Sequence, residues 1–64
     1  MKLTDFIRHL QMHGCKLHRE GGSHTIYINQ NNGKKASVPR HREIKFPTAI
    51  RICRQLEIVL PDKR

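Results

Sequence analysis

Apolar residues near the start of the chain recur with the spacing of one helix face. The stripe consists of Leu3, Phe6, Ile7 and Leu10. This i, i+3, i+4, i+7 spacing is typical of an amphipathic helix that buries one side. Thr4 belongs to the residue types that cap helix N-termini, and Gly14 to those that end helices in a left-handed conformation. The pattern predicts a first helix from about Thr4 to His13, with Thr4 as its N-cap.

The next two segments alternate between apolar and polar residues, which is typical of strands. The first runs from Cys15 to Arg19 and the second from His24 to Asn29, with the turn-forming pair Gly21-Gly22 between them. Side chains of a strand point alternately to opposite faces of the sheet. In the first strand we expect Cys15 and Leu17 on one face, with Lys16 and His18 on the other.

A hairpin and a third strand follow. Asn31-Asn32-Gly33 is a strong hairpin signal, because Asn-Gly tolerates the positive φ values of a primed turn. Alternation over Lys35–Val38 predicts the third strand, which Pro39 closes because proline cannot donate to a ladder. A polar, basic loop, 40–43, comes next.

A second helix is predicted around Pro47, which suits the first turn of a helix. Its buried stripe, at the same helical spacing, is Ala49, Ile52, Cys53 and Leu56. The tail is expected to be frayed beyond Pro61, with the frayed segment beginning at about residue 58 at the earliest.

The elements therefore follow the order helix, three strands, helix in a single domain, 1–64. Neither helix can bury its stripe alone, so both must pack on one face of the antiparallel sheet. This α+β arrangement, αβββα, is the layout of double-stranded-RNA-binding domains. It leaves the other face of the sheet exposed. Ile26 and Ile28 share a face with His24, so if these isoleucines meet the helices, His24 must emerge at the strand end to act.

The composition narrows the function. The chain has 64 residues, 36% of them hydrophobic, and 13 Lys and Arg against 5 Asp and Glu, a formal net charge of +8. Such a charge on a small surface favours nucleic acid or an acidic protein as partner. A merely soluble basic surface is the alternative, and the concentration of charge around the loops and one strand argues against it.

The two cysteines are expected to be free core thiols, because a disulfide framework belongs to secreted proteins. No signal core or membrane-spanning run is found in the sequence, so we expect a cytoplasmic protein. A zinc site is disfavoured because Cys15 and His18, three residues apart on a strand, point to opposite faces. Five scattered acids do not make a magnesium site either. We expect no cofactor and no metal.

His24 is the candidate catalytic residue, because it follows Gly21-Gly22-Ser23 at the start of a predicted strand in a basic chain. Imidazole exchanges protons near neutral pH, and RNA supplies its own nucleophile, the 2′-hydroxyl. Ser23 could orient a phosphate oxygen, and amides near Gly22 could stabilise developing negative charge. A strand-edge histidine that only bonds a neighbour is the structural alternative.

Basic residues offer phosphate contacts that would position RNA without reading its sequence. Those expected to do so are Lys34, Lys35, Arg40, His41 and Arg42, with Lys16, Arg19 and Arg51 extending the surface. Tyr27 could stack on a base or pack on the sheet, and the sequence does not decide between these roles. A non-catalytic RNA-binding module with the same fold is the alternative function.

These residues resemble the HicA (YcfA-like) toxins, small ribonucleases of toxin–antitoxin modules. The resemblance rests on the motif Arg19-x-x-Gly22-Ser23-His24, on the segment Val38-Pro39-Arg40-His41 and on Glu43-Ile44 before the second helix. It implies an mRNA interferase with a double-stranded-RNA-binding-like fold and His24 as its catalytic histidine, inhibited by a HicB antitoxin. Cys15 stands where the family often has an aromatic residue, and Phe46-Pro47 where Pro-Gly is common, which affects local packing only.

Overall fold

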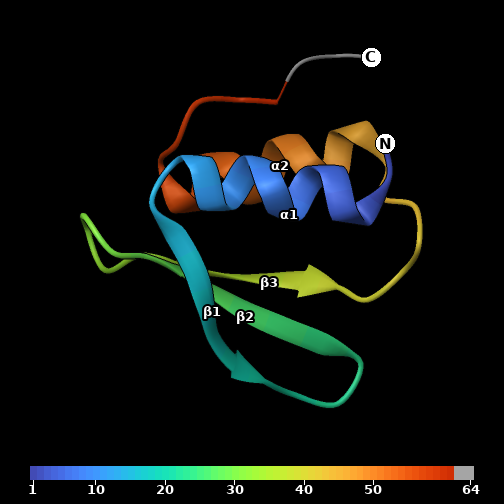
Figure 1. Cartoon of the computed structure of the whole chain (residues 1–64), viewed down its shortest axis with the longest axis horizontal. Coiled ribbons are helices and arrows are strands. Elements are labelled where there is room, and N and C mark those ends of the chain that lie inside the picture. The colour runs from blue at the N-terminus through green and yellow to red at the C-terminus, as the bar shows by residue number, and fades with distance from the viewer. Residues whose placement is uncertain (62–64) are drawn as a thin grey trace.

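Two helices lie on the same side of a three-stranded antiparallel sheet (Figure 1). The computed structural model describes residues 1–61. Its elements are α1 (Leu3–Met12), β1 (Cys15–Glu20), β2 (His24–Asn29), β3 (Lys35–Pro39) and α2 (Phe46–Leu56). The strands are ordered β1-β2-β3, so that β2 is central. The predicted αβββα fold is confirmed.

The first helix begins differently from the prediction. Its N-cap is Lys2, and no side chain caps it, so the N-cap prediction for Thr4 is wrong. Lys2 forms an antiparallel bridge with Glu43, and the Leu3 amide donates to the Arg42 carbonyl at 2.8 Å. This pairing supplies backbone partners where a threonine hydroxyl was expected. The helix ends at Met12 with His13 as its C-cap, and Gly14 follows with the predicted left-handed φ, +83°.

A β-bulge interrupts the alternation of the first strand. Leu17 pairs with Tyr27 but Arg19 pairs with Ile26, so His18 is an extra residue in β1. An extra residue shifts the alternation of every side chain after it. Arg19 therefore lies opposite Ile26 rather than on the face of Leu17, which simple alternation did not predict.

The helices cover the face of β2 that carries Tyr27 and Asn29, both of which are buried. Ile26 and Ile28 are half-buried on the other face, and His24 is exposed there. The isoleucines therefore do not meet the helices. Because His24 already lies on the uncovered face, it does not have to emerge from the core side at the strand end.

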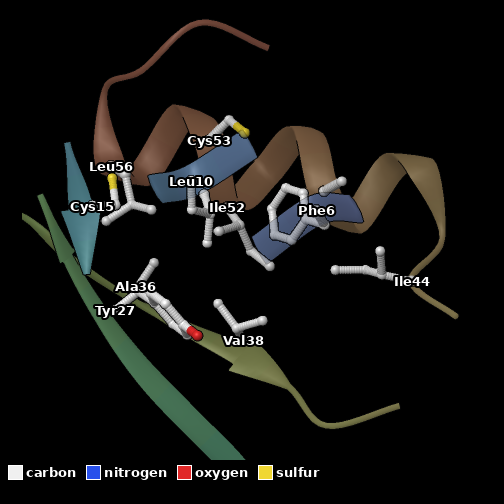
Figure 2. Close-up of a cluster of buried hydrophobic side chains, with 11 residues drawn as sticks. Phe6, Leu10, Cys15, Tyr27, Ala36, Val38, Ile44, Ile52, Cys53 and Leu56 are labelled. Carbon is white, nitrogen blue, oxygen red and sulfur yellow. The ribbon is translucent and has the colours of Figure 1, made fainter. Parts of the chain in front are cut away.

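The core fills the space between the helices and the sheet, as Figure 2 shows. The core contains the predicted apolar stripe of α2, together with Phe6 and Leu10 of the predicted α1 stripe. Its members are Phe6, Leu10, Cys15, Tyr27, Ala36, Val38, Ile44, Ala49, Ile52, Cys53 and Leu56. Cys15 and Cys53 are both free and buried, as expected.

The segment after α2 returns along α1. Ile58 packs against the core, Pro61 is buried, and Nε2 of His9 lies 2.8 Å from the Val59 carbonyl oxygen. The fraying expected of this tail concerns its motion and stays a prediction, and residues 62–64 lie outside the described residues.

Candidate functional site

His24 is the first residue of β2 and is exposed to solvent. Its register partner is Pro39, the last residue of β3. Ser23 Oγ lies 3.3 Å from His24 Nδ1, within hydrogen-bonding distance, and residues 1–61 contribute no hydrogen bond to Nε2. The strand thus presents an imidazole with one nitrogen held by a hydroxyl and the other open.

A tight turn delivers His24 to this position. The Gly21 amide donates to the His24 carbonyl oxygen at 2.9 Å, which closes the turn between β1 and β2. A Cβ atom added at Gly21 would lie 3.2 Å from that oxygen, whereas one at Gly22 would meet nothing within 4 Å. A side chain at 21 would therefore crowd the His24 carbonyl oxygen, while the space beside Gly22 is open to a ligand.

Arg40 holds the same turn from the side of β3. Its Nη2 donates to the Gly21 carbonyl oxygen at 2.7 Å and lies 3.5 Å from Glu20 Oε1. The ion pair is exposed and contributes little by itself. Because the guanidinium is engaged with the backbone, Arg40 positions the turn before His24 in addition to adding positive charge.

A cleft of about 590 Å³ opens beside His24, between the end of β3, the loop 40–45 and α2. Besides His24, three basic side chains line it: His41, Lys45 and Arg51. The remaining lining residues are Ser37, Pro39, Glu43, Ile44, Thr48, Ile52 and Gln55. The cleft is suited to a phosphate group, which cations and hydroxyls can hold. A larger hollow, of about 910 Å³, runs along α1 and the tail and does not include His24.

The predicted substrate-binding residues fall into three places. His41 shares the cleft with His24, and Gly22 and Ser23 lie in the turn before it. Arg42 lines a separate hollow beside the N-terminus, together with Arg40.

Lys34 and Lys35 lie at the other end of β3 from His24. Lys35 pairs with Ile28, and Lys34 Nζ lies 3.8 Å from Glu57 Oε2. The structure does not bring these two lysines into the cleft, although Lys35 belongs to the same sheet.

Lys45, Thr48 and Gln55 were not among the predicted site residues, and they line the cleft from α2 and the residue before it. A signal for them exists in the sequence. Thr48, Arg51 and Gln55 recur at i, i+3 and i+7, directly beside the buried stripe of α2. A polar row bordering an apolar stripe lies where a helix meets the rim of the sheet.

Two further side chains are settled by burial. Tyr27 lies in the core with its ring between sheet and helices (Figure 2), so it packs on the sheet and is not placed to stack on a base. Burial, with a smaller contribution from Glu20, raises the pKa of Tyr27. Burial also raises the pKa of Cys15, which keeps this thiol protonated at neutral pH.

The described residues show neither a metal-binding cluster nor a membrane helix. Within 1–61, no group of three or more His, Cys, Asp or Glu side chains could hold a metal ion together. Neither α1 nor α2 is long and apolar enough to cross a membrane.

Fold and site together define a class: a small, basic αβββα protein with an exposed histidine at a strand end beside a cationic cleft. Residues 4–58 match the family model described as the HicA toxin of bacterial toxin–antitoxin systems. The chain belongs to the HicA toxin family, which makes it the toxin of a toxin–antitoxin module with a cognate antitoxin as partner. Comparisons with curated proteins and with solved structures give no match.

Proposed function

We propose that this toxin is a cytoplasmic endoribonuclease, an mRNA interferase that cuts RNA by acid–base catalysis with His24. The observation that carries the proposal is the exposed His24 imidazole beside a cleft that also holds His41, Lys45 and Arg51. A general acid or base must be accessible to the substrate and must be able to exchange protons, and the exposed imidazole of His24 meets both needs.

The contact with Ser23 suits either half of this chemistry. As a base, the neutral ring donates from Nδ1–H to the Ser23 hydroxyl oxygen and accepts the 2′-proton at Nε2. As an acid, the imidazolium keeps the same Nδ1–H donation and gives its Nε2 proton to the leaving oxygen. Ser23 therefore orients the ring in both protonation states. The same nitrogen, Nε2, faces no competing partner among residues 1–61.

The reaction we propose needs no nucleophile from the protein. The RNA 2′-oxygen attacks the adjacent phosphorus, the bond from phosphorus to the 5′-oxygen breaks, and the leaving oxygen takes up a proton. The products are a 2′,3′-cyclic phosphate and a 5′-hydroxyl. His24 removes the 2′-proton or protonates the leaving oxygen. Lys45 and Arg51 supply cations that hold the phosphate and stabilise its developing charge, and His41 offers a ring N–H donor beside them.

The cognate antitoxin, which we propose to be of the HicB type, would inhibit the enzyme by covering the cleft or by occupying the basic surface. A net charge of +8 favours an acidic partner on that surface. We also propose that catalysis is metal-independent, since acid, base and phosphate-binding groups are all present as side chains.

The decisive experiment compares His24→Ala with His13→Ala in EDTA. His13 is a half-exposed histidine at the end of α1, outside the cleft, so its loss is a matched control. We expect His24→Ala to lose at least about 100-fold in cleavage rate, as for other general acids and bases. His13→Ala should cut like the wild type, and the fragments should end in 2′,3′-cyclic phosphates.

Two results would contradict the proposal. Cleavage by His24→Ala at the wild-type rate would remove His24 from the mechanism. RNA binding by the wild type without any cleavage would instead identify a non-catalytic RNA-binding module.

A further inference from the structure

The face of the sheet that points away from both helices is covered by no described element. In Figure 1 both helices lie on one side of the sheet, and the other side is bare. Besides His24, strand register places Ser37 and Pro39 there, together with five isoleucine or cationic side chains: Lys16, Arg19, Ile26, Ile28 and Lys35. We call these five residues and His24 the open face.

The open face has an apolar centre with cations on both sides. Ile28 lies between Lys16 of β1 and Lys35 of β3, its two register partners. Neighbouring strands are about 4.8 Å apart, so the two lysines flank the isoleucine at a separation of about 10 Å. The isoleucines are half-buried and the lysines exposed. This row therefore offers an apolar contact between two positive charges.

The second row depends on the bulge in β1. Because His18 is the extra residue, Arg19 lies opposite Ile26 and joins the open face. Without the bulge, Arg19 would share the face of Leu17. The irregularity of β1 thus adds a third cation to a surface that already carries two.

Charge identifies the kind of molecule that fits this surface. No acidic residue among residues 1–61 has a register position on the open face. Within that part of the chain, Lys16, Arg19 and Lys35 form no ion pair, whereas Arg8, Lys34 and Arg40 do. Three uncompensated cations around an apolar centre suit a polyanion that also presents flat apolar groups, which is a nucleic acid strand.

The apolar centre distinguishes single strands from duplexes. In an A-form duplex the faces of the bases are stacked on one another, and proteins bind its phosphates and 2′-hydroxyls instead. Unpaired bases can lie flat on Ile26 and Ile28 while their phosphates reach the cations. The open face is also continuous with the catalytic histidine, since β2 carries His24 about 13 Å from Ile28.

We propose that the open face binds a single-stranded segment of the RNA substrate and leads it to His24. This inference rests on the proposed ribonuclease function and names its substrate class: unpaired RNA, even though the layout is that of duplex-binding domains. The bases contact Ile26 and Ile28, and Lys16, Arg19 and Lys35 contact phosphates.

The test measures RNA binding in the His24→Ala protein, which leaves the RNA intact. The probes are a fluorescent single strand of about 12 nucleotides of mixed sequence and the duplex of the same sequence, followed by anisotropy. The open-face variant combines Lys16→Gln, Arg19→Gln and Lys35→Gln. Its matched control removes three charges from the helical side: Lys2→Gln, Arg8→Gln and Arg54→Gln.

Each phosphate contact with a single strand contributes about 0.7 to the slope of log K against log salt concentration. The open-face variant should therefore lose about 2 units of slope and about 100-fold in affinity at about 0.1 M salt. The control should keep the slope. Ile28→Ser should weaken binding without changing the slope, and Leu17→Ser, on the other face, should not weaken it.

The outcomes separate the two proposals. Equal losses in both triple variants, or a duplex that binds as tightly as the single strand, would overturn the open face as a single-strand site even if the wild type cuts RNA. Unchanged RNA binding with lost inhibition by the antitoxin would make it a protein-binding face instead. A wild type that fails to cut RNA, with binding lost only in the open-face variant, would overturn the ribonuclease function and leave the binding site standing.

Discussion

The two glycines before His24 have different roles, although the sequence presents them as a pair. The Gly21 amide closes the turn onto the His24 carbonyl oxygen, and a side chain at 21 would press on that oxygen. At Gly22 a side chain would meet nothing. The first glycine thus avoids a crowded contact with the backbone, and the second leaves room next to the imidazole.

We expect Gly21→Ala to destabilise the protein and Gly22→Ala not to. The added Cβ at 21 must displace the His24 carbonyl by a few tenths of an ångström, which costs about 1 kcal/mol and lowers the melting temperature by about 4–8 °C. Gly22→Ala should melt within about 2 °C of the wild type. Calorimetry of both variants measures this difference, and equal melting temperatures would contradict the assigned roles.

The Cys53 thiol makes the stability of the fold depend on alkaline pH. Burial, and secondarily the neighbouring Cys15, raises the pKa of Cys53 to about 11. In the unfolded chain the thiol ionises at its ordinary, lower pKa, so the folded state binds more protons between the two values. Stability is therefore complete below the ordinary pKa and falls as the pH rises towards about 11.

We expect the wild type to lose on the order of 1–3 kcal/mol of this stability between about pH 9 and 11, relative to Cys53→Ala. The measurement is the free energy of unfolding in urea across that range for both proteins. Tyr27 has a pKa raised in the same direction, but it is present in both proteins and cancels in the comparison. A constant difference between the two curves would show that Cys53 does not titrate differently on folding.

Asn29 joins the second hairpin to the end of α2. This buried side chain donates from Nδ2 to the Leu56 carbonyl oxygen at 2.9 Å and accepts from the Asn31 amide at 2.9 Å. Asn32 donates to the same Leu56 carbonyl at 3.1 Å from a more exposed position. One carbonyl at the helix C-terminus, where acceptors lack helical partners, thus receives two donors.

We expect Asn29→Ala to cost about 1–3 kcal/mol and Asn32→Ala less than about 1 kcal/mol. Removing Asn29 leaves the Asn31 amide without its acceptor and empties a buried position, whereas removing Asn32 leaves Leu56 its other donor. Urea unfolding of the two variants compares the costs. A larger cost for Asn32→Ala would place the main attachment of the hairpin outside the core.

Element order could be predicted from the sequence because periodicity and turn residues act locally. Gly14 follows the end of α1 with a positive φ, as expected, and Gly33 has a positive φ in the second hairpin. Asn32 does not have one, so the prediction of a primed turn at Asn32-Gly33 is wrong, and a longer loop joins β2 to β3. The start of α1 could not be predicted, since the bridge between Lys2 and Glu43 joins residues far apart in the chain. The bulge at His18 could not be predicted either, because it depends on the register between β1 and β2, which pairing between strands sets.

The candidate site could be predicted only as far as its motif is contiguous. Ser23 and His24 are neighbours in sequence and in space. Basic residues of one segment need not share a site: His41 enters the cleft, while Lys35, six positions earlier, lies towards the other end of the sheet. Lys45 lines the cleft because α2, which it precedes, packs against β3. This packing is a tertiary contact, which the positions of charges along the sequence do not reveal.

Positive charge greatly exceeds negative charge over the whole molecule. The net charge is +8 on 64 residues, and the ion pairs of residues 1–61 are all exposed on at least one side. Repulsion among the cations is therefore stronger than their attraction to the few acidic side chains. Such repulsion opposes the compact state but favours a polyanionic ligand. Salt should act on stability and on RNA affinity in opposite directions.

We expect an increase from about 20 to about 500 mM NaCl to stabilise the free protein and to weaken its complex with single-stranded RNA. The Debye length shortens from roughly 20 Å to roughly 4 Å, which is less than the distance between most surface charges, so self-repulsion is screened. The same salt opposes the release of counterions on which RNA binding depends. Melting temperatures and RNA affinities measured in the same buffers test both expected changes.

The melting temperature of the triple variant Lys16→Gln, Arg19→Gln, Lys35→Gln should depend less on salt than that of the wild type, because three of the repelling cations are gone. A melting temperature that falls with salt would mean that attractive ion pairs outweigh repulsion, despite the excess of 13 Lys and Arg over 5 Asp and Glu.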